Sequence, residues 1–160
     1  MLTVRDARPE DAEALAAILN RIIEIGGTTA YQTPRPPETF RADVLDREGL
    51  ISCVVAEADG APVGFQYLSR DERLPPGWAT IASFARAEPK VPGVGRAMMA
   101  ATLERARAAG VRSIDATIRA DNAQGLGFYE AMGFRTYEVH EAVPLSDGTP
   151  VDRISKRLDP

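Results

Sequence analysis

Two glycines one residue apart, Gly93 and Gly95, lie where an apolar, strand-like run (residues 78–87) gives way to a helical run that begins at Arg96. The first turn of a helix leaves backbone N–H groups without partners, and these groups together with the helix dipole bind anions, phosphate above all. Glycine lets a ligand approach the backbone closely because it has no Cβ. The turn therefore predicts a phosphate-binding site.

The charge around this turn agrees with that prediction. Residues 86–112 hold six basic side chains (Arg86, Lys90, Arg96, Arg105, Arg107 and Arg112) and two acidic ones (Glu88 and Glu104), a balance of +4 in a chain whose net charge is -4. The basic residues thus gather at one turn and its helix, whereas a nucleic-acid partner needs a broad basic surface. We expect a small phosphate-bearing ligand and no nucleic acid.

Length and composition narrow the class of protein further. A chain of 160 residues with 44% hydrophobic and 26% charged residues suits one globular domain over residues 1–160. One cysteine, Cys53, excludes an internal disulfide, and with a single histidine it predicts no metal site. No apolar run approaches the roughly 18 residues of a membrane helix, and the first residues do not read as a signal peptide, so a cytoplasmic protein is expected.

The spacing of apolar residues predicts an α/β fold with a mixed central sheet. The expected order is β-α-α-β-β-β-α-β-α-β-β. The predicted strands cover residues 2–7, 50–57, 63–69, 78–87, 113–119, 134–143 and 151–158, and the predicted helices cover 9–25, 37–47, 96–109 and a segment from a cap at Asp121 to Met132. Cys53 falls inside an apolar strand, which favours a core position.

A second motif begins at the start of the fourth predicted helix. It consists of Asn122, Tyr129 seven residues later, and the pair Gly133-Phe134. Together with the glycine turn and the element order, it resembles the GNAT superfamily of N-acyltransferases over essentially the whole chain. The phosphate turn of that superfamily is Arg/Gln-x-x-Gly-x-Gly/Ala, and here it reads Lys90-x-x-Gly93-x-Gly95. Lysine replaces the usual first residue, and Pro92 removes one backbone donor.

The resemblance implies a GNAT acyl-CoA N-acyltransferase fold, with acetyl-CoA as co-substrate. The implied cofactor-binding residues are Ser83, Phe84, Ala85, Lys90, Val91, Pro92, Gly93, Val94, Gly95, Arg96 and Asn122. Within the superfamily, the chain is similar to the phosphinothricin and small amino-acid N-acetyltransferases. This narrower similarity implies a small-molecule amine as acceptor. Because the only thiol, Cys53, lies mid-strand in an apolar run, we expect direct transfer in a ternary complex without an acyl-enzyme. A homodimer is also expected.

The resemblance makes Tyr129 the acid on the thiol side, and its chemistry suits that role. Amide formation from a thioester must return a proton to the departing thiolate. A cysteine-like thiol has a pKa of about 8.5 and a tyrosine about 10, so Tyr129 stays protonated at neutral pH and can give its proton. Taken alone, Tyr129 would be interpreted as a core aromatic residue and Asn122 as a helix-entry residue.

The usual base of this fold is missing from the sequence. Many relatives have a glutamate on the strand before the glycine turn, and the corresponding residue here is Thr80. Glu24, Asp71, His140 or a chain of waters are the open substitutes. The polar loop of residues 28–37 contains the candidate acceptor-binding residues Thr28, Thr29 and Tyr31.

Two other functions fit parts of the sequence. A non-catalytic acyl-CoA sensor on the same fold would need no base. A dinucleotide-dependent oxidoreductase would use the glycine turn for pyrophosphate and Asp115, twenty residues past Gly95, for a ribose hydroxyl. Against the oxidoreductase, Met98 occupies the third glycine position, and about 45 residues remain for a second nucleotide-binding half.

Overall fold

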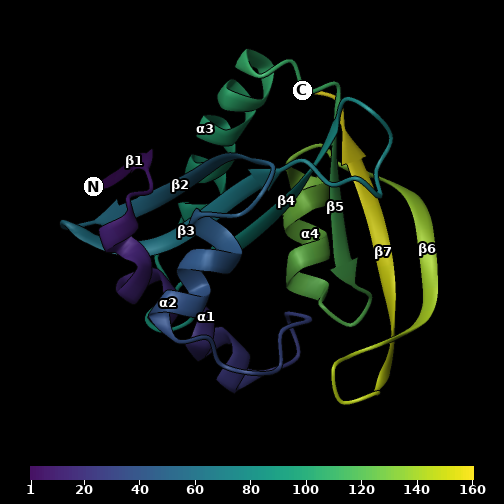
Figure 1. Cartoon of the computed structure of the whole chain (residues 1–160), viewed down its shortest axis with the longest axis horizontal. Helices are drawn as coiled ribbons and strands as arrows, with labels where there is room; N and C mark the ends of the chain where they lie inside the picture. The colour runs from purple at the N-terminus through teal and green to yellow at the C-terminus, as the bar shows by residue number, and fades with distance from the viewer.

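Seven strands form one mixed sheet in the computed structural model, which describes residues 1–160 (Figure 1). The strands are β1 (Leu2–Asp6), β2 (Leu50–Ala58), β3 (Ala61–Ser69), β4 (Trp78–Ala85), β5 (Ser113–Arg119), β6 (Arg135–Pro144) and β7 (Pro150–Leu158). They lie in the order β1-β2-β3-β4-β5-β7-β6. All neighbouring pairs are antiparallel except β4 and β5, which are parallel.

The parallel pair at the centre of the sheet separates soon after it forms. β4 and β5 pair only where residues 78–80 face residues 113–115. From Ile81 to Ala85, β4 pairs with β3 alone. The backbone of β4 therefore presents a free edge over these residues, at a gap in the middle of an otherwise continuous sheet.

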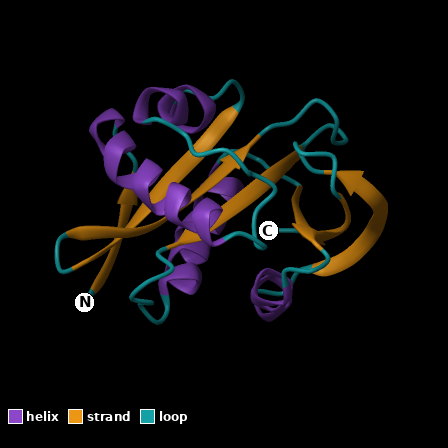
Figure 2. Cartoon of the chain, turned by 90° about the horizontal axis from the view of Figure 1, so that it is seen from below, coloured by secondary structure: helices purple, strands orange, loops and turns teal.

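Helices cover both faces of the sheet (Figure 2). The 3-10 turn η1 (Pro9–Asp11) leads into α1 (Ala12–Ile25), and α2 (Pro37–Phe40) continues as a π-helical turn, η2 (Arg41–Leu45). These segments pack on one face of β2 and β3. The opposite face is covered by α3 (Val94–Ala108), and by α4 (Ala123–Ala131) next to β5. No helix is long and apolar enough to cross a membrane.

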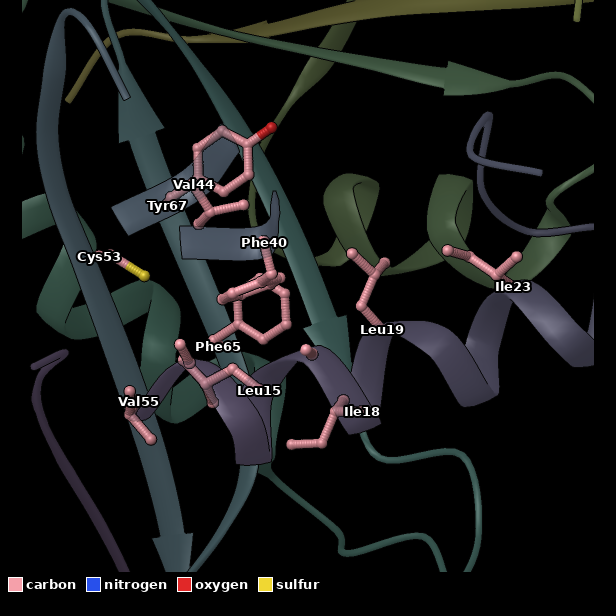
Figure 3. Packing of buried hydrophobic residues seen from close by; sticks show 12 residues of the cluster. Leu15, Ile18, Leu19, Ile23, Phe40, Val44, Cys53, Val55, Phe65 and Tyr67 are labelled. Carbon is pink, nitrogen blue, oxygen red and sulfur yellow. The ribbon is translucent and has the colours of Figure 1, made fainter. Parts of the chain in front are cut away.

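The core on the α1 face is built around Phe65 of β3 (Figure 3). Its ring makes an edge contact with Phe40 at 5.3 Å and stacks on Phe84 at 4.9 Å between centroids. Leu15 and Leu19 of α1 close this cluster, and both are fully buried. The helical spacing of the apolar residues therefore places one face of α1 against the sheet.

The predicted α/β fold and element order are confirmed, with changes at element ends. The strand leading to the glycine turn ends at Ala85 instead of residue 87, and the second helix ends at Leu45. The prediction that Asp121 caps α4 is wrong. Asn122 is the cap, since its side chain accepts a hydrogen bond from a backbone N–H of the first turn, while Asp121 forms an ion pair with Arg119 at 2.7 Å.

Candidate active site

A cavity of about 890 Å³ passes through the gap between β4 and β5. Its lining includes the glycine turn, the loop of residues 28–31, β4 and the start of α4. The cavity therefore joins segments that are far apart in the sequence. It is the place where two reactants can meet.

The glycine turn has the backbone conformation that the sequence predicts. Gly93 caps α3 with φ +82°, a left-handed conformation that favours glycine. The first intrahelical bond runs from the N–H of Ala97 to the carbonyl of Gly93, which leaves the preceding N–H groups of the first turn without helical acceptors. The side chains or backbone of Lys90, Val91, Gly93, Val94 and Gly95 line the cavity.

Two of the residues predicted to bind the cofactor at this turn, Pro92 and Arg96, do not line the cavity. Gly95 also has a structural reason that the sequence did not reveal. A Cβ at this position would come within 2.6 Å of the Phe128 ring of α4. Gly95 is therefore required by the close packing of α4 on α3. A bulky residue there would disturb the packing as well as any ligand.

The predicted free edge of β4 is present, and Ser83, Phe84 and Ala85 line the cavity. Their contact with the cofactor stays a prediction. Their side chains point to different faces of the sheet because successive residues of a strand alternate. Phe84 packs into the core of the α1 face against Phe65. Ser83 lies on the opposite face, where its hydroxyl contacts Tyr129 of α4.

Tyr129 combines a core position with a polar contact. The side chain is 6% exposed, and its ring packs edge-on against Phe128 and Phe134. Its hydroxyl lies 2.8 Å from Ser83 Oγ, and the side-chain amide of Gln66 donates to the same Ser83 oxygen at 2.8 Å. The ring is therefore held by packing and the hydroxyl by a fixed partner at the cavity wall.

Burial of Tyr129 raises the pKa of its phenol to about 12, and the hydrogen bond with Ser83 offsets only part of this effect. The phenol therefore keeps its proton even more firmly than a free tyrosine. One consequence differs from the sequence-based expectation of a pKa near 10. Loss of the Tyr129 proton should not cause a fall in rate below about pH 11.

Asn122 is both a helix cap and a link between segments. Its Oδ1 accepts a hydrogen bond from the N–H of Gly125 at 2.9 Å, and its Nδ2 donates to the carbonyl of Thr28 at 3.0 Å. Asn122 lines the cavity, and it fixes the loop that carries the candidate acceptor residues. Its predicted contact with the cofactor stays a prediction.

The loop residues predicted to bind the acceptor do line the cavity: Thr28, Thr29 and Tyr31. Arg119 of β5 donates to the carbonyl of Thr29 at 3.0 Å and helps to hold the loop. Sequence reasoning missed several other side chains of the lining, which come from separate strands and loops. They are Arg47, Tyr67, Arg73, Arg119 and Arg153. No local motif marks them, because only the fold brings them together.

The lining of the cavity is strongly basic. It contains six basic residues (Arg47, Arg73, Arg86, Lys90, Arg119 and Arg153) and one acidic residue, Asp71, in a chain of net charge -4. Asp71 forms an ion pair with Arg73, and Asp121 with Arg119. Arg153 forms no ion pair, and its buried Nε has no hydrogen-bond partner. The cavity therefore favours anionic ligands.

The candidate substitutes for the missing base differ in whether they line the cavity and in whether they can accept a proton. Thr80 lines the cavity and has no basic group of its own. Glu24 is exposed and pairs with Arg21 away from the cavity lining. Asp71 lines the cavity, but hydrogen bonds from Arg73 lower its pKa to about 2, which makes it a weak base. His140 bonds to Ser155 through Nε2.

Asp115 does not have the position that a ribose-binding acid requires. It is 4% exposed, lies outside the cavity lining, and accepts hydrogen bonds from hydroxyl groups within the sheet. The interpretation of Asp115 as a ribose ligand is therefore wrong. The oxidoreductase hypothesis loses the second of the two features on which it rested.

Cys53 is a core residue, as predicted. Its thiol is buried in the cluster between α1 and the sheet, away from the cavity (Figure 3). Burial is the main cause that raises the pKa of the thiol to about 12. A thiol that keeps its proton is a poor nucleophile, and this one lies out of reach of the cavity.

Known proteins resemble this chain in sequence and in fold. An L-methionine sulfoximine/L-methionine sulfone acetyltransferase of Pseudomonas aeruginosa is 29% identical over 140 residues, which cover 82% of this chain and 79% of the relative. An aminoglycoside N(6')-acetyltransferase type 1 of Stenotrophomonas maltophilia is 29% identical over 152 residues, covering 89% and 94%.

Among solved structures, a GNAT superfamily phosphinothricin acetyltransferase of Sinorhizobium meliloti, in complex with AcCoA, has the same fold. Its TM-score is 0.84 at 23% identity, and the match covers 99% of this chain and 88% of that one. The family model described as "Acetyltransferase (GNAT) family" matches residues 15–134 of this chain. These residues include the glycine turn, Tyr129 and the gap in the sheet. The chain belongs to the GNAT family of acetyltransferases, whose acetyl donor is acetyl-CoA.

Proposed function

We propose that this protein transfers the acetyl group of acetyl-CoA directly to the primary amine of a small molecule that carries a carboxylate, an amino acid or a close analogue. The observation that carries the proposal is the cavity through the β4–β5 gap. Its lining combines a helix N-terminus, a free strand edge, a protonated tyrosine and several arginines. Donor and acceptor can therefore bind together, as direct transfer requires.

The residues of the donor end fit the phosphate-rich arm of acetyl-CoA. Backbone N–H groups of the first turn of α3 have no helical acceptors, and Lys90 and Arg86 add positive charge beside them. The unpaired edge of β4 over residues 81–85 can accept and donate hydrogen bonds to an extended amide chain. Asn122 lies at the same wall.

Acetyl-CoA supplies an acyl group activated as a thioester. Tyr129 gives its proton to the sulfur as the thiolate departs, and Ser83 holds the phenol in place at 2.8 Å. Because Tyr129 is protonated and shielded from water, its hydroxyl can donate a proton to the sulfur without water taking its place. No acyl-enzyme forms, since the only thiol, Cys53, is buried in the hydrophobic cluster between α1 and the sheet.

The charge of the acceptor end supports an amino acid over an aminoglycoside. Arg153 has a buried Nε without a hydrogen-bond partner. Arg47 donates to the Tyr67 hydroxyl at 3.1 Å and lies over the ring of the same residue, and it forms no ion pair. An arginine fork suits a carboxylate well. A polycationic aminoglycoside would meet like charges in the same place.

The proposal also includes a single domain over residues 1–160, a cytoplasmic location and a homodimer. All strands belong to one sheet, which supports one domain. The outer strand β6 exposes Tyr137 and Val139 on an edge without a neighbour, a surface that a second copy can cover. Light scattering at assay concentration distinguishes a dimer from a monomer.

The test is an amine panel with acetyl-CoA, followed through released thiol and product mass. It contains L-methionine sulfone, L-methionine sulfoximine, phosphinothricin, an aminoglycoside and, as a matched control, the decarboxylated analogue of methionine sulfone. We expect an amino acid to exceed its decarboxylated analogue by about 10- to 100-fold in kcat/KM, the value of a charge-assisted hydrogen bond.

Two results would contradict the proposal. Acetyl-CoA binding without turnover of any amine would favour the sensor. Equal turnover of the amino acid and its decarboxylated analogue, or preference for the aminoglycoside, would contradict a carboxylate-bearing acceptor.

A further inference from the structure

A buried carboxylate lies directly behind the place of the missing base. Thr80 and Asp115 are partners in the short parallel pairing of β4 and β5, so their side chains share one face of the sheet. Thr80 Oγ1 lies 3.4 Å from Asp115 Oδ2 and donates to it. Thr80 lines the cavity, whereas Asp115 is 4% exposed and lies outside the lining. Two hydroxyl groups of the cavity lining, those of Thr80 and Thr117, thus contact the carboxylate. Thr80 occupies the place of the missing base.

The carboxylate continues into a line of hydrogen-bonded groups that reaches the surface. Thr117 Oγ1 lies 3.1 Å from both oxygens of Asp115 and 2.7 Å from Ser155 Oγ. Ser155 Oγ lies 2.9 Å from His140 Nε2. The side chain of His140 is 39% exposed, so the line ends at solvent. Every link is a group that can both receive and pass on a proton.

We propose that Asp115 replaces the missing glutamate, taking the proton of the acceptor amine through the Thr80 hydroxyl and releasing it to His140 through Thr117 and Ser155. The inference rests on the proposed function, because it concerns the same acetyl transfer. It assigns to this chain a base that lies one strand away from the usual position, with a hydroxyl as intermediary.

The proton transfer balances without any further reactant. The N–H of an ammonium group passes its proton to Thr80 Oγ1, while the Thr80 proton moves to Asp115 Oδ2. The products are a neutral amine and a neutral carboxylic acid, and Thr80 is unchanged. The acid then returns its proton along Thr117 and Ser155 to the imidazole, which exchanges with water. The lone pair of the amine becomes free to attack.

Several charged and titratable groups surround Asp115 and set its proton affinity. Tyr137 and His140 approach from β6, Arg157 lies opposite on β7, Tyr129 lies on α4, and Arg73 is in the loop before β4. Burial raises the pKa of Asp115, and the hydroxyls of Tyr137, Thr117 and Thr80 lower it in part. A raised pKa makes this carboxylate a stronger base than an exposed aspartate.

The test compares variants with the panel amine that the parent acetylates fastest. Asp115→Asn should lower kcat/KM by about 100-fold, the low end of a general-base contribution, and should remove the acid limb of its pH profile. Thr80→Val should match this loss, and Thr80→Ser should recover activity because it restores the hydroxyl. The double variant Asp115→Asn/Thr80→Val should fall no further than either single variant, since both interrupt one route.

Tyr137→Phe gives a second test, because it should shift the pH profile only if Asp115 acts as the base and not if Asp115 has a purely structural role. The phenol donates to Asp115 at 2.7 Å and stabilises its ionised form. Its loss should raise the pKa of Asp115, so the acid limb should move to higher pH. Thr102→Val is the matched control, since the Thr102 hydroxyl is buried on α3 without a partner and lies outside this route. Its profile should equal that of the parent.

The inference is overturned if Thr80→Val and Thr80→Ser turn over equally fast, or if Asp115→Asn keeps the parental acid limb. If Asp115→Asn does not fold, as judged by its melting curve and acetyl-CoA binding, the Thr80 pair decides alone. A parent that turns over no amine contradicts the proposed function instead. An active parent with indifferent variants contradicts only the proton route.

Discussion

One face of the sheet is used in two opposite ways. Over β2 and β3, the face is covered by α1 and α2, and its side chains are the buried cluster of Cys53, Val55, Phe65 and Tyr67 (Figure 3). Over β5 and β7, the corresponding face bears Asp115, Thr117, Ser155 and Arg153, and no helix lies over β6 and β7 in Figure 1. Apolar residues lie where helices cover the sheet. In the other half, Asp115 and Ser155 are buried as well, and hydrogen bonds from neighbouring hydroxyl groups satisfy them.

β4 belongs to both halves of this face. Phe84 near its end stacks on Phe65 in the covered half, while Thr80 near its start contacts Asp115 in the uncovered half. The gap opens between these two residues, because pairing with β5 stops at Thr80. The covered half therefore anchors the end of the strand by packing, and we propose that the polar half contacts the ligand. Substitutions should separate the two roles as stability and activity.

The largest effect should come from the covered half. Phe65→Ala removes a fully buried ring with two aromatic neighbours and should lower the free energy of unfolding by about 4 kcal/mol. Guanidinium unfolding measures this change. Glu13→Ala on the exposed side of α1 is the control and should change stability by less than about 0.5 kcal/mol. Equal unfolding midpoints for both variants would remove the distinction between the halves.

A smaller effect, on binding, should come from the uncovered half. Arg153→Met removes a cation from the cavity wall and should raise KM for the amino acid about tenfold, with little loss of stability. Initial rates across acceptor concentrations measure it. Arg107→Met, on the exposed side of α3, serves as the matched control. An unchanged KM, or an equal rise for the decarboxylated amine, would show that Arg153 does not bind a carboxylate.

The smallest effect should follow Cys53→Ala. The thiol lies in the covered half, so its loss should cost about 1 kcal/mol of stability and leave turnover within about twofold of the parent. Intact-protein mass after incubation with acetyl-CoA should show no acetylated thiol. An acetylated Cys53, or parallel lines in two-substrate kinetics, would contradict direct transfer.

The sequence predicted the parts of this protein that depend on local pattern. The apolar spacing predicted the element order, and Gly93-x-Gly95 predicted the turn that opens α3. It did not predict that Gly95 makes room for Phe128, because that contact joins two helices far apart in the chain. For the same reason, the cavity arginines carry no local signal.

The cap of α4 shows the limit at short range. Asp121 and Asn122 are both good capping residues, and adjacent candidates look alike in sequence. Tertiary contacts decide between them: Arg119 pairs with Asp121, while Asn122 reaches the carbonyl of Thr28. Asp115 illustrates the same point at longer range. Its spacing from Gly95 favours a ribose ligand, but the fold surrounds it with hydroxyl donors.

The central claim is that acetyl transfer occurs at the β4–β5 gap with Tyr129 as proton donor, and Tyr129→Phe tests it most directly. The substitution removes one oxygen and keeps the ring between Phe128 and Phe134. Turnover under saturating acetyl-CoA and amine should fall about 100-fold. The Kd of acetyl-CoA, measured by calorimetry, should stay within about twofold, because we propose that its phosphates bind at the glycine turn, away from the Tyr129 hydroxyl. A folded Tyr129→Phe protein with parental turnover would contradict the account, and would leave Tyr129 as a core residue alone.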